Sequence, residues 1–393
     1  MEILQPNSLA ASLLKQALAR RASDMHLEPG AEILRVRIRV DGILEELCCL
    51  PLVQHSTLVT QLKVASGMDI AEKRVPQDSR LSFNYDGQAV DVRLATLPTI
   101  SGEKLALRFL VRDAALLSLD NLSFSKHNLA CWRKLMQQPN GLVLLTGPTG
   151  SGKTTTLYAA LGELDARSLN IVTLEDPVEY QLPGINQIAV NRKAGLDFAT
   201  GLRALVRQDP DVIMLGEIRD EETAAMAVHA ALTGHLVLST LHTNDALGAV
   251  YRLLDMGIAD YLLAAALRGV LAQRLVRRLC PACAKQKLAS EPELRYLGRK
   301  QGEQLLLKEA AGCEHCHNTG YNGRLAVQEL LPWTKDLAQQ MLRGAGEAEL
   351  LPYAREAGWR SLYQDGISKV LDGLTTVSEL WRQGIMSGGE GDV

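Results

Sequence analysis

Apolar and polar residues alternate in the first part of this chain. The segment ILRVRIRVDG, residues 33–42, alternates apolar residues with arginines, which is typical of a half-exposed strand that ends in an Asp-Gly hairpin turn. The same pattern predicts further strands, and helical spacing of apolar residues predicts helices. The predicted strands are 80–85, 89–95 and 104–110, and the predicted helices are 9–22 and 58–65. Residues 1–112 are therefore expected to form a small α+β domain.

Continuous apolar runs replace this alternation from about residue 141. The predicted strands are 142–146, 171–174, 212–215 and 236–240, and the predicted helices between them are 153–164, 198–207 and 221–232. Apolar strands between helices indicate a mostly parallel sheet covered on both faces. We therefore expect an N-terminal α+β domain (1–112), a linker (113–140), an α/β core (141–276), a four-cysteine module (277–330) and a C-terminal helical domain (331–393).

Residues 147–154, GPTGSGKT, fit the phosphate-binding pattern G-x-x-x-x-G-K-[ST], with the strand before it and the helix after it that the pattern requires. Its glycines let backbone N–H groups surround phosphate, and the helix N-terminus adds a favourable partial charge. Lys153 is expected to reach the β- and γ-phosphates of ATP, and the Thr154 hydroxyl a magnesium ion. The predicted nucleotide-binding residues are Gly147, Pro148, Thr149, Gly150, Ser151, Gly152, Lys153, Thr154 and Thr155.

Three ionisable residues follow the other strands of the predicted core. Glu175, Glu217 and His242 each come after an apolar run. Ligands of open parallel sheets bind beyond the carboxyl ends of the strands, so these residues are expected to share a crevice with the phosphate-binding loop. Any one of them alone is equally well explained as a surface charge. Gly216 stands where an aspartate that helps to hold magnesium is usual, which leaves the role of Glu217 open.

Four of the seven cysteines form two C-x-x-C pairs, Cys280 with Cys283 and Cys313 with Cys316. In a reducing compartment such pairs are metal ligands more often than disulfides. Four thiolates suit a tetrahedral zinc ion, and closed sites of this kind are structural. The sequence therefore predicts a structural zinc module.

Composition excludes some functions. Apolar residues make up 47% and charged residues 22% of the 393 residues, and the net charge is −3. This balance gives no general attraction to nucleic acid or acidic lipid. No apolar run approaches the roughly 20 residues that span a bilayer, and the N-terminus lacks the features of a signal peptide. We therefore expect a cytoplasmic protein.

The motifs together resemble those of the secretion ATPases of type II secretion and type IV pilus systems. The matching segments run from about residue 8 to 390: SDMHLEP, RVDG, DIAEKRVPQDSR, AVDVR, GPTGSGKTTTLYAAL, NIVTLEDPVEYQLPG, LVRQDPDVIMLGEIRDEETA and TGHLVLSTLHTNDA. The resemblance implies a homohexamer of RecA-like P-loop ATPase cores, each preceded by a PAS-like α+β domain, that uses ATP and Mg²⁺ and carries Zn²⁺. The cysteine module implies the type II secretion and pilus-assembly branch, because retraction ATPases lack it. LAQRLVRRLCPAC and GCEHCHNTGYNGR look most like the type II secretion enzyme.

The same resemblance implies catalytic roles. Glu217 becomes the general base or water-positioning residue, and Glu175 takes part of the metal's second shell beside Thr154. His242 senses the γ-phosphate, and Gly216 leaves room beside the phosphate-binding loop. Arginines complete the site, supplied by the N-terminal domain across the ring (Arg80 and Arg93, with Arg74 and Arg108 as weaker candidates) or lying near the subunit boundary (Arg203 and Arg207). Each lone arginine is also explained as a solvated charge, and Ser79 replaces the family's usual glycine before Arg80.

We therefore expect a hexameric ATPase that powers type II protein secretion by driving pseudopilus assembly on an inner-membrane platform, which it contacts only through partner proteins. A type IV pilus assembly ATPase is the alternative of the same class. A nucleic-acid translocase and a nucleotide-gated scaffold are alternatives of other classes. The charge balance disfavours the first of these, and Lys153 with Glu217 disfavours the second. The branch usually has a further N-terminal docking domain, and this chain begins close to the domain before the motor, so the mode of docking is left open.

Overall fold

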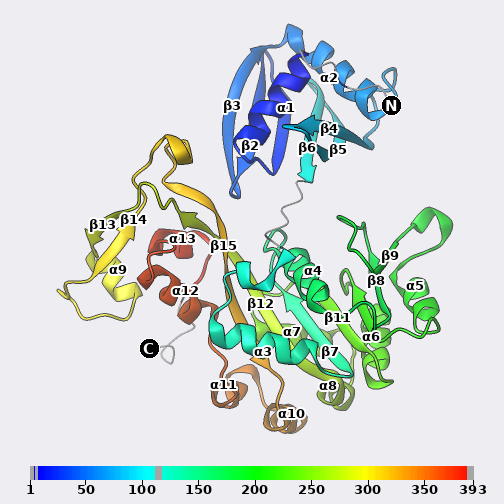
Figure 1. Cartoon of the computed structure of the whole chain (residues 1–393), viewed down its shortest axis with the longest axis vertical. Helices are drawn as coiled ribbons and strands as arrows, with labels where there is room; N and C mark the ends of the chain where they lie inside the picture. Colours follow the sequence, from blue (N-terminus) through cyan, green and yellow to red (C-terminus); the bar gives the residue numbers. More distant parts are fainter. Residues whose placement is uncertain (1–3, 5–7, 111–116, 387–393) are drawn as a thin grey trace. The chain divides into compact units, whose positions relative to one another are not determined.

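The computed structural model describes residue 4, residues 8–110 and residues 117–386 (Figure 1). The chain divides into two compact units, Met1–Asp113 and Ala114–Val393. The predicted boundary at residue 112 and the start of the predicted linker lie outside the described residues. Within the described part, no helix combines the length and the apolar character that crossing a bilayer requires.

The N-terminal unit is an antiparallel sheet of six strands with two helices, in the strand order β3-β2-β1-β6-β5-β4. Its elements are α1 (Leu9–Ala19), β1 (Asp24–Pro29), β2 (Ile33–Val40), β3 (Ile43–Pro51), α2 (Val53–Ser66), β4 (Gln77–Tyr85), β5 (Gln88–Thr99) and β6 (Gly102–Leu110). Alternation in the sequence predicted β2, whose residues Leu34, Val36 and Ile38 are fully buried. It did not predict β1, a six-residue strand in which only Met25 and Leu27 are buried.

The second unit is built on a mixed sheet of seven strands in the order β15-β12-β7-β11-β10-β8-β9. These strands are β7 (Gly141–Thr146), β8 (Ile171–Glu175), β9 (Asn186–Ala189), β10 (Val212–Leu215), β11 (Leu236–Leu241), β12 (Leu267–Leu279) and β15 (Tyr321–Pro332). Neighbouring strands from β12 to β9 run parallel, and β15 runs antiparallel to β12. The predicted α/β class is confirmed, because continuous apolar runs form the central strands and are buried on both faces.

Helices cover both faces of this sheet (Figure 1). They are α3 (Lys126–Met136), α4 (Lys153–Glu163), α5 (Phe198–Leu205), α6 (Glu221–Leu232), α7 (Ala246–Asp255) and α8 (Asp260–Ala266). Successive residues of β7 point to opposite faces, so Leu142 and Leu144 pack with α5 to α8 while Val143 and Leu145 pack with α3 and α4. The central strands are therefore held from both sides, which fixes where their carboxyl ends lie.

The cysteine segment is an insertion between two paired strands of the sheet. The predicted core ended at residue 276 and the predicted cysteine module ran to residue 330, whereas β12 and β15 pair in the sheet as far as Leu279 and Tyr321. The inserted segment contains β13 (Lys285–Leu288), α9 (Glu291–Tyr296) and β14 (Leu306–Glu309). Neither β12 nor β15 was among the predicted strands, and arginines near the end of β12 interrupt its apolar run.

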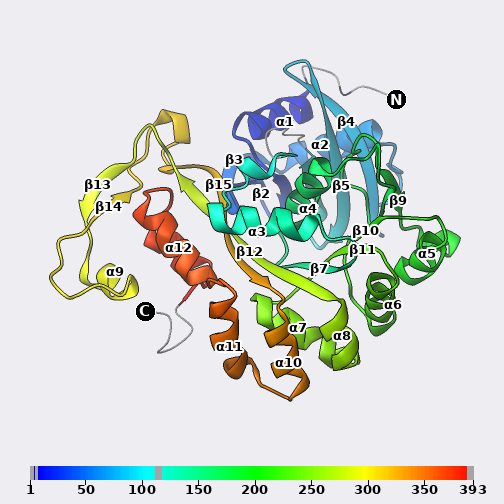
Figure 2. The same cartoon turned by 60° about the horizontal axis from the view of Figure 1, so that its bottom comes forward.

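Four helices close the described chain: α10 (Lys335–Leu342), α11 (Glu347–Glu356), α12 (Leu362–Leu371) and α13 (Val377–Arg382). Figure 2 shows α12 on the side of the inserted segment, α10 beside α8, and α11 beside α10. Leu297 and Leu307 of the inserted segment share one apolar core with Tyr363 and Val370 of α12. The inserted segment and the last helices are thus packed together, although we predicted them as separate parts.

Candidate functional site

The turn between β7 and α4 has the backbone that the phosphate-binding pattern predicts. Gly147, Gly150 and Gly152 have φ angles of 143°, 80° and 86°, values that favour glycine. The ammonium of Lys153 donates to the carbonyl oxygens of Gly147 at 2.7 Å and Pro148 at 3.2 Å. Burial lowers the pKa of Lys153 to about 8, against the opposing charge of Glu217. The lysine side chain therefore lies in the loop, and its pKa is close to neutral pH.

The other predicted nucleotide-binding residues differ in exposure. Pro148, Thr149, Gly150 and Thr154 are exposed, whereas Thr155 is half-buried. Ser151 is buried, and its Oγ has no hydrogen-bond partner among the described residues. An exposed hydroxyl at the first turn of α4 suits the metal ligand that was predicted at Thr154.

Glu217 and His242 meet at the carboxyl ends of adjacent strands. The strands β7, β11, β10 and β8 are neighbours and parallel, so the residues that follow them lie along one edge. The Oε2 atom of Glu217 lies 3.5 Å from Nε2 of His242, and the two side chains are 15% and 46% exposed. Arg219 approaches Oε1 of Glu217 at 2.5 Å, and this hydrogen bond raises the pKa of Arg219. Glu217 is thus held between a histidine and an arginine, near enough to Lys153 to influence its charge.

Glu175 ends β8, one strand beyond Glu217, but its carboxylate is occupied. The residue is 3% exposed and accepts hydrogen bonds from Tyr158 of α4, from Thr173 at 2.5 Å and from Gln187 at 3.2 Å. Burial, followed by the bond to Glu175, raises the pKa of Tyr158. In this structure Glu175 therefore fastens β8 and β9 to α4, and its predicted place beside the metal stays a prediction.

Gly216 has β8 and α5 as its nearest neighbours, and its predicted place beside the phosphate-binding loop stays a prediction. A Cβ atom on Gly216 would have Cα of Glu175 at 3.4 Å, the Leu174 oxygen at 3.5 Å and the Phe198 ring at 3.6 Å as its nearest neighbours. These are ordinary contacts, and they belong to β8 and α5 rather than to the phosphate-binding loop. The absence of a side chain at Gly216 therefore leaves space next to Leu174 and Glu175, at the end of β8.

The two arginines that were predicted near a subunit boundary, Arg203 and Arg207, are both exposed, the first on α5 and the second just after it. Arg203 forms an ion pair with Glu222 of α6. Arg207 lies two residues beyond the end of the helix. Their predicted role at a subunit boundary stays a prediction.

Three arginines of the N-terminal unit lie in one row across its sheet. Arg80 pairs in register with Arg93, and Arg93 pairs with Arg108. Arg108 binds Asp24 at 3.0 Å, and Arg74 binds its neighbour Glu72 at 2.7 Å. Ser79 is an ordinary residue of β4, so the replacement of glycine there does not distort the strand that carries Arg80. Whether these arginines reach a nucleotide stays a prediction.

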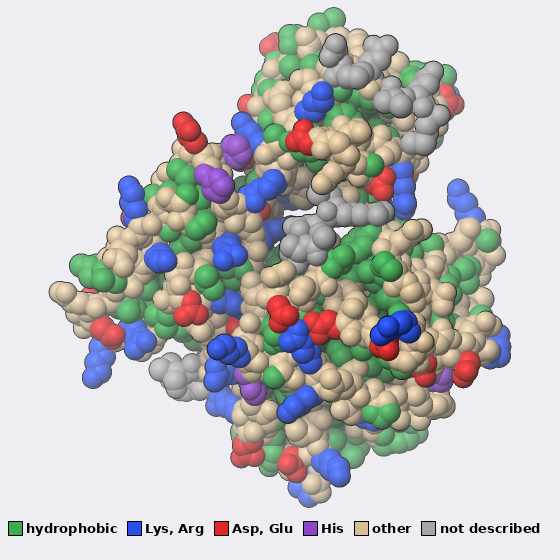
Figure 3. Space-filling model, viewed as in Figure 1, with side chains coloured by type: hydrophobic (Ala, Val, Ile, Leu, Met, Phe, Trp, Pro, Cys, Tyr) green, Lys and Arg blue, Asp and Glu red, His purple; other side chains and the backbone are tan. Residues whose placement is uncertain are grey.

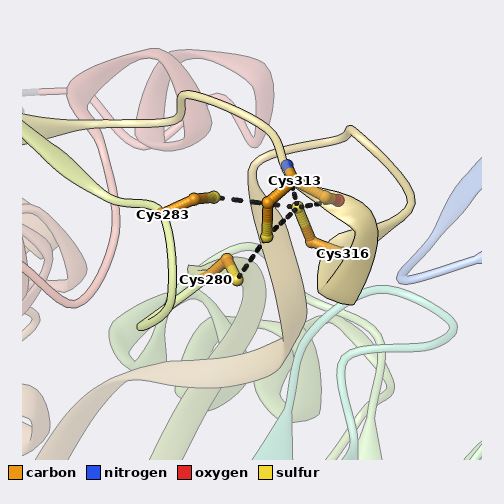
Figure 4. Close-up of side chains that lie close together, drawn as sticks. All are labelled: Cys280, Cys283, Cys313 and Cys316. Atoms are coloured by element: carbon orange, nitrogen blue, oxygen red, sulfur yellow. Dashed lines mark hydrogen bonds between the residues drawn. The ribbon is translucent and has the colours of Figure 1, made fainter.

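The four predicted zinc ligands converge. Figure 4 shows their sulfur atoms pointing toward one another from two arms of the inserted segment, and all four lie within 4.8 Å of one another. Three of the distances are 3.9 Å (Cys280 to Cys313), 3.8 Å (Cys283 to Cys316) and 3.7 Å (Cys313 to Cys316). Zinc–sulfur bonds of about 2.3 Å in a tetrahedron require sulfur atoms about 3.8 Å apart, so the four thiols fit this ion.

One thiol of this group is ready to ionise. Burial opposes ionisation of Cys316, but the backbone N–H groups of Cys313 and Gly320 donate to its sulfur at 3.2 Å each and lower its pKa to about 6. For Cys283 burial is the larger effect and raises the pKa, against a backbone hydrogen bond from Gly312 that lowers it. A thiolate is the form that binds metal, so Cys316 is the natural first ligand.

Charge is spread evenly over the visible surface. On the face drawn in Figure 3, lysine and arginine side chains are interspersed with acidic ones, with no continuous basic stripe.

Comparison with known proteins places the chain in a family. The profile of the family described as "Type II/IV secretion system protein" matches residues 5–382. The chain belongs to this family. It is 48% identical over 374 residues to "Type II secretion system protein E" of Pseudomonas aeruginosa, covering 95% of this chain and 74% of that protein. It is 47% identical over 375 residues to "Type II secretion system ATPase E" of Vibrio cholerae, with the same two coverages.

Solved structures agree on the fold. The ATPase DotB of Legionella pneumophila superimposes with a TM-score of 0.69 at 19% identity, covering 97% of this chain and 98% of that one. The pilus retraction motor PilT with bound ADP superimposes with a TM-score of 0.63 at 25% identity, covering 96% of each chain. The predicted P-loop fold of this secretion family member is therefore confirmed.

Three polar residues of the site were missed in the sequence. Arg219 stands two residues after Glu217, within a segment that we quoted, and its spacing to Glu217 was a usable signal. Tyr158 and Gln273 gave no such signal, because both lie in largely apolar segments and meet their partners only through the fold.

Proposed function

We propose that this secretion ATPase hydrolyses ATP as a homohexamer to power type II protein secretion, by driving pseudopilus assembly on an inner-membrane platform. The observation that carries the proposal is the meeting of Glu217, His242 and Lys153 at the carboxyl edge of the sheet. Relatives at 47% and 48% identity are named for type II secretion, and one of them is named an ATPase. These names favour secretion over pilus assembly as the process served.

In this proposal the loop between β7 and α4 binds the phosphates. Lys153 exchanges the loop carbonyls of Gly147 and Pro148 for the β- and γ-phosphates, which are stronger partners for an ammonium ion. Glu217 accepts a hydrogen bond from the attacking water and orients it toward the γ-phosphate. His242, in contact with Glu217, reports whether that phosphate is present.

In this proposal Arg219 competes with the attacking water for the carboxylate of Glu217. Its ion pair with Glu217 occupies one oxygen of the proposed base. Binding of the phosphates offers Arg219 a second anionic partner, which frees Glu217 for water.

Thr154, exposed in the first turn of α4, would hold magnesium, and Glu175 would belong to the ion's second shell. When bound, the ion neutralises charge on the β- and γ-phosphates. Glu175 stabilises the surrounding segments through Tyr158 and Gln187, so its contribution is made by position rather than by direct contact.

Hexamer formation completes the site in this proposal. Phosphoryl transfer requires positive charge near the γ-phosphate, often an arginine from another subunit. The row of Arg80, Arg93 and Arg108 and the exposed pair Arg203 and Arg207 are the candidates. A cytoplasmic ring that contacts the membrane only through platform proteins is consistent with the absence of a bilayer-spanning helix from the described residues.

The test is steady-state hydrolysis of ATP with magnesium, measured with and without a fused ring-forming partner. Fusion is expected to raise turnover, and Glu217→Gln is expected to lower it by a factor on the order of 10² or more, because a general base contributes about 10² to 10⁴. Nucleotide binding by Glu217→Gln should persist.

Glu221→Gln is the matched control. It removes an exposed carboxylate four residues along the chain, at the start of α6, and should leave turnover unchanged. The proposal would be contradicted if turnover were the same in Glu217→Gln as in the wild type and the same with and without the fused ring-forming partner. That result would favour a nucleotide-gated scaffold.

A further inference from the structure

Strand β12 brings Gln273 against the phosphate-binding loop. Ala272 pairs with Thr146, the last residue of β7, so the following residue of β12 lies level with the loop. A Cβ atom on Gly147 would lie 2.3 Å from the backbone oxygen of Gln273, and one on Gly152 would lie 3.0 Å from its Nε2 atom. Two glycines of the loop are therefore packed directly on Gln273, which is itself 2% exposed.

The side-chain amide of Gln273 joins the loop to the helix that follows it. Its Nε2 atom donates to the carbonyl oxygen of Ser151 at 2.7 Å. Its Oε1 atom accepts from the hydroxyl of Thr156, in the first turn of α4, at 3.0 Å. One buried side chain thus sets the separation between the loop and the start of α4, where Lys153 and Thr154 lie.

The bond to Ser151 also fixes the direction of a backbone N–H group. In a trans peptide the C=O and the next N–H point in opposite directions. Because the Ser151 oxygen points toward Gln273, the N–H of Gly152 points away from it. In loops of this pattern the backbone N–H groups face the phosphates, so the amide of Gln273 controls one of these donors.

Gln328 of β15 holds the amide of Gln273 in this orientation. The two residues pair in register, and Nε2 of Gln328 donates to Oε1 of Gln273 at 2.9 Å. The backbone oxygen of Ser151 can only accept, so it fixes the nitrogen of Gln273 on its side and leaves the Oε1 atom facing Thr156 and Gln328. The backbone N–H of Gln328 in turn donates to Asp365 of α12 at 2.7 Å.

We propose that Gln273 is a positioning residue for ATP. By fixing the Ser151–Gly152 peptide and the start of α4, it holds the loop ready for phosphate before nucleotide arrives. This inference rests on the proposed function, because it takes ATP as the ligand of the loop. It assigns to β12 a role in nucleotide affinity that is separate from the chemistry at Glu217.

The test compares Gln273→Met with the wild-type chain by equilibrium binding of a fluorescent ATP analogue with magnesium, and by steady-state turnover. Methionine keeps the length of the side chain and removes all three hydrogen bonds. The dissociation constant and KM should rise about tenfold, which corresponds to about 1.4 kcal/mol. The value of kcat at saturating ATP should stay within about twofold, because Glu217 is untouched.

Two further variants separate positioning from loss of stability. Thr156→Val keeps the shape of the side chain and removes only its bond to Gln273, so the dissociation constant should rise about threefold. Arg277→Met is the control on the same strand. It removes a residue that binds Glu379 of α13 at 2.6 Å and stacks on Tyr321, so it should lower the melting temperature without changing nucleotide affinity.

Each outcome decides the proposal. If Gln273→Met is destabilised like Arg277→Met but binds the analogue as tightly as the wild type, Gln273 is only structural and the proposal is overturned. If Gln273→Met does not fold, an unchanged dissociation constant in Thr156→Val overturns it instead. A wild-type chain that does not bind ATP refutes the proposed function. The inference alone is refuted by a different set of results. In that set the wild type is active, Glu217→Gln has lost turnover, and Gln273→Met binds the analogue as tightly as the wild type.

Discussion

Burial makes the Lys153 ammonium easier to deprotonate than an exposed lysine. Burial in the loop lowers its pKa to about 8, although the carboxylate of Glu217 pulls the pKa upward. Bound phosphates would favour the ammonium form and raise the pKa again. Nucleotide binding above this pH must therefore be accompanied by proton uptake.

We predict that affinity for ATP falls as pH rises above about 8, by up to about tenfold per pH unit, because the free protein loses the proton that the complex retains. Titration calorimetry in buffers of different ionisation enthalpy, from about pH 7 to about pH 9.5, measures both the affinity and the proton uptake. In Glu217→Gln the fall should begin at a lower pH, because the charge that raises the lysine pKa is removed. An affinity that is constant over this range would show that Lys153 stays charged throughout.

Single residues were predicted from the sequence when a local pattern defined them. The loop glycines and Lys153 follow from one contiguous motif, and Glu217 and His242 follow from their places after strands. The interactions of Glu175 with Tyr158, and of Gln273 with Ser151, join segments far apart in the chain. No local pattern encodes such pairs, so only the fold reveals them.

At the scale of elements, the four strands predicted for the core are buried on both faces and lie within one residue of their predicted bounds. β10 and α6 begin and end where the apolar pattern placed them, because an uninterrupted apolar run is bounded by polar residues. The strand β9 was missed because only two of its four residues are even half-buried. An edge strand of this kind depends on its neighbour rather than on its own composition.

Helices α7 and α12 share one buried carboxylate between their first residues. Glu329 of β15 accepts from the backbone N–H of Ala246 at 2.9 Å and from that of Leu362 at 3.2 Å. Burial raises its pKa to about 7, although both backbone donors favour the charged form. The junction of the two helices is therefore sensitive to pH.

We predict that Glu329 makes the folded state less stable as pH rises from about 5 to about 7.5, by at most about 3 kcal/mol. The pKa of Glu329 is higher in the folded state than in the unfolded state, so the folded state binds more protons across this range. The free energy of unfolding therefore decreases as the pH rises and Glu329 loses its proton. Urea unfolding of wild type and Glu329→Gln, monitored at both ends of the range, measures the effect. The difference between the two proteins should change with pH, and a constant difference would mean that Glu329 is already ionised at pH 5.

At the scale of the whole molecule, the two units were visible in the sequence as a change from alternating to continuous apolar segments. Their internal limits were less visible. One apolar core is shared by the inserted segment, the ends of β12 and β15, and the helices α12 and α13. Ion pairs also join β12 to α13. Arg277 of β12 binds Glu379 of α13, which also binds Arg382 at 2.7 Å.

We predict one zinc ion per chain, and its loss should loosen this whole end of the second unit. Native mass spectrometry of the full chain should find the ion in the wild type and not in Cys316→Ser, and a strong chelator should lower the melting temperature. Cys131→Ser is the control, because that half-buried thiol belongs to α3 and lies outside the cluster. Full zinc content in Cys316→Ser would contradict the four-thiolate site.

The pairing of Leu279 with Tyr321 has a consequence for how this end of the second unit could be redesigned. The chain leaves the sheet and returns to it at facing positions, so a short hairpin turn could replace everything between them without disturbing the strands. The last helices would not survive that replacement unchanged, because Leu279 also donates to the Leu374 oxygen at 2.8 Å and Tyr296 donates to the Ile385 oxygen at 2.5 Å. The insertion and the C-terminal helices therefore depend on each other for packing, and removing the insertion would also require changes in the C-terminal helices.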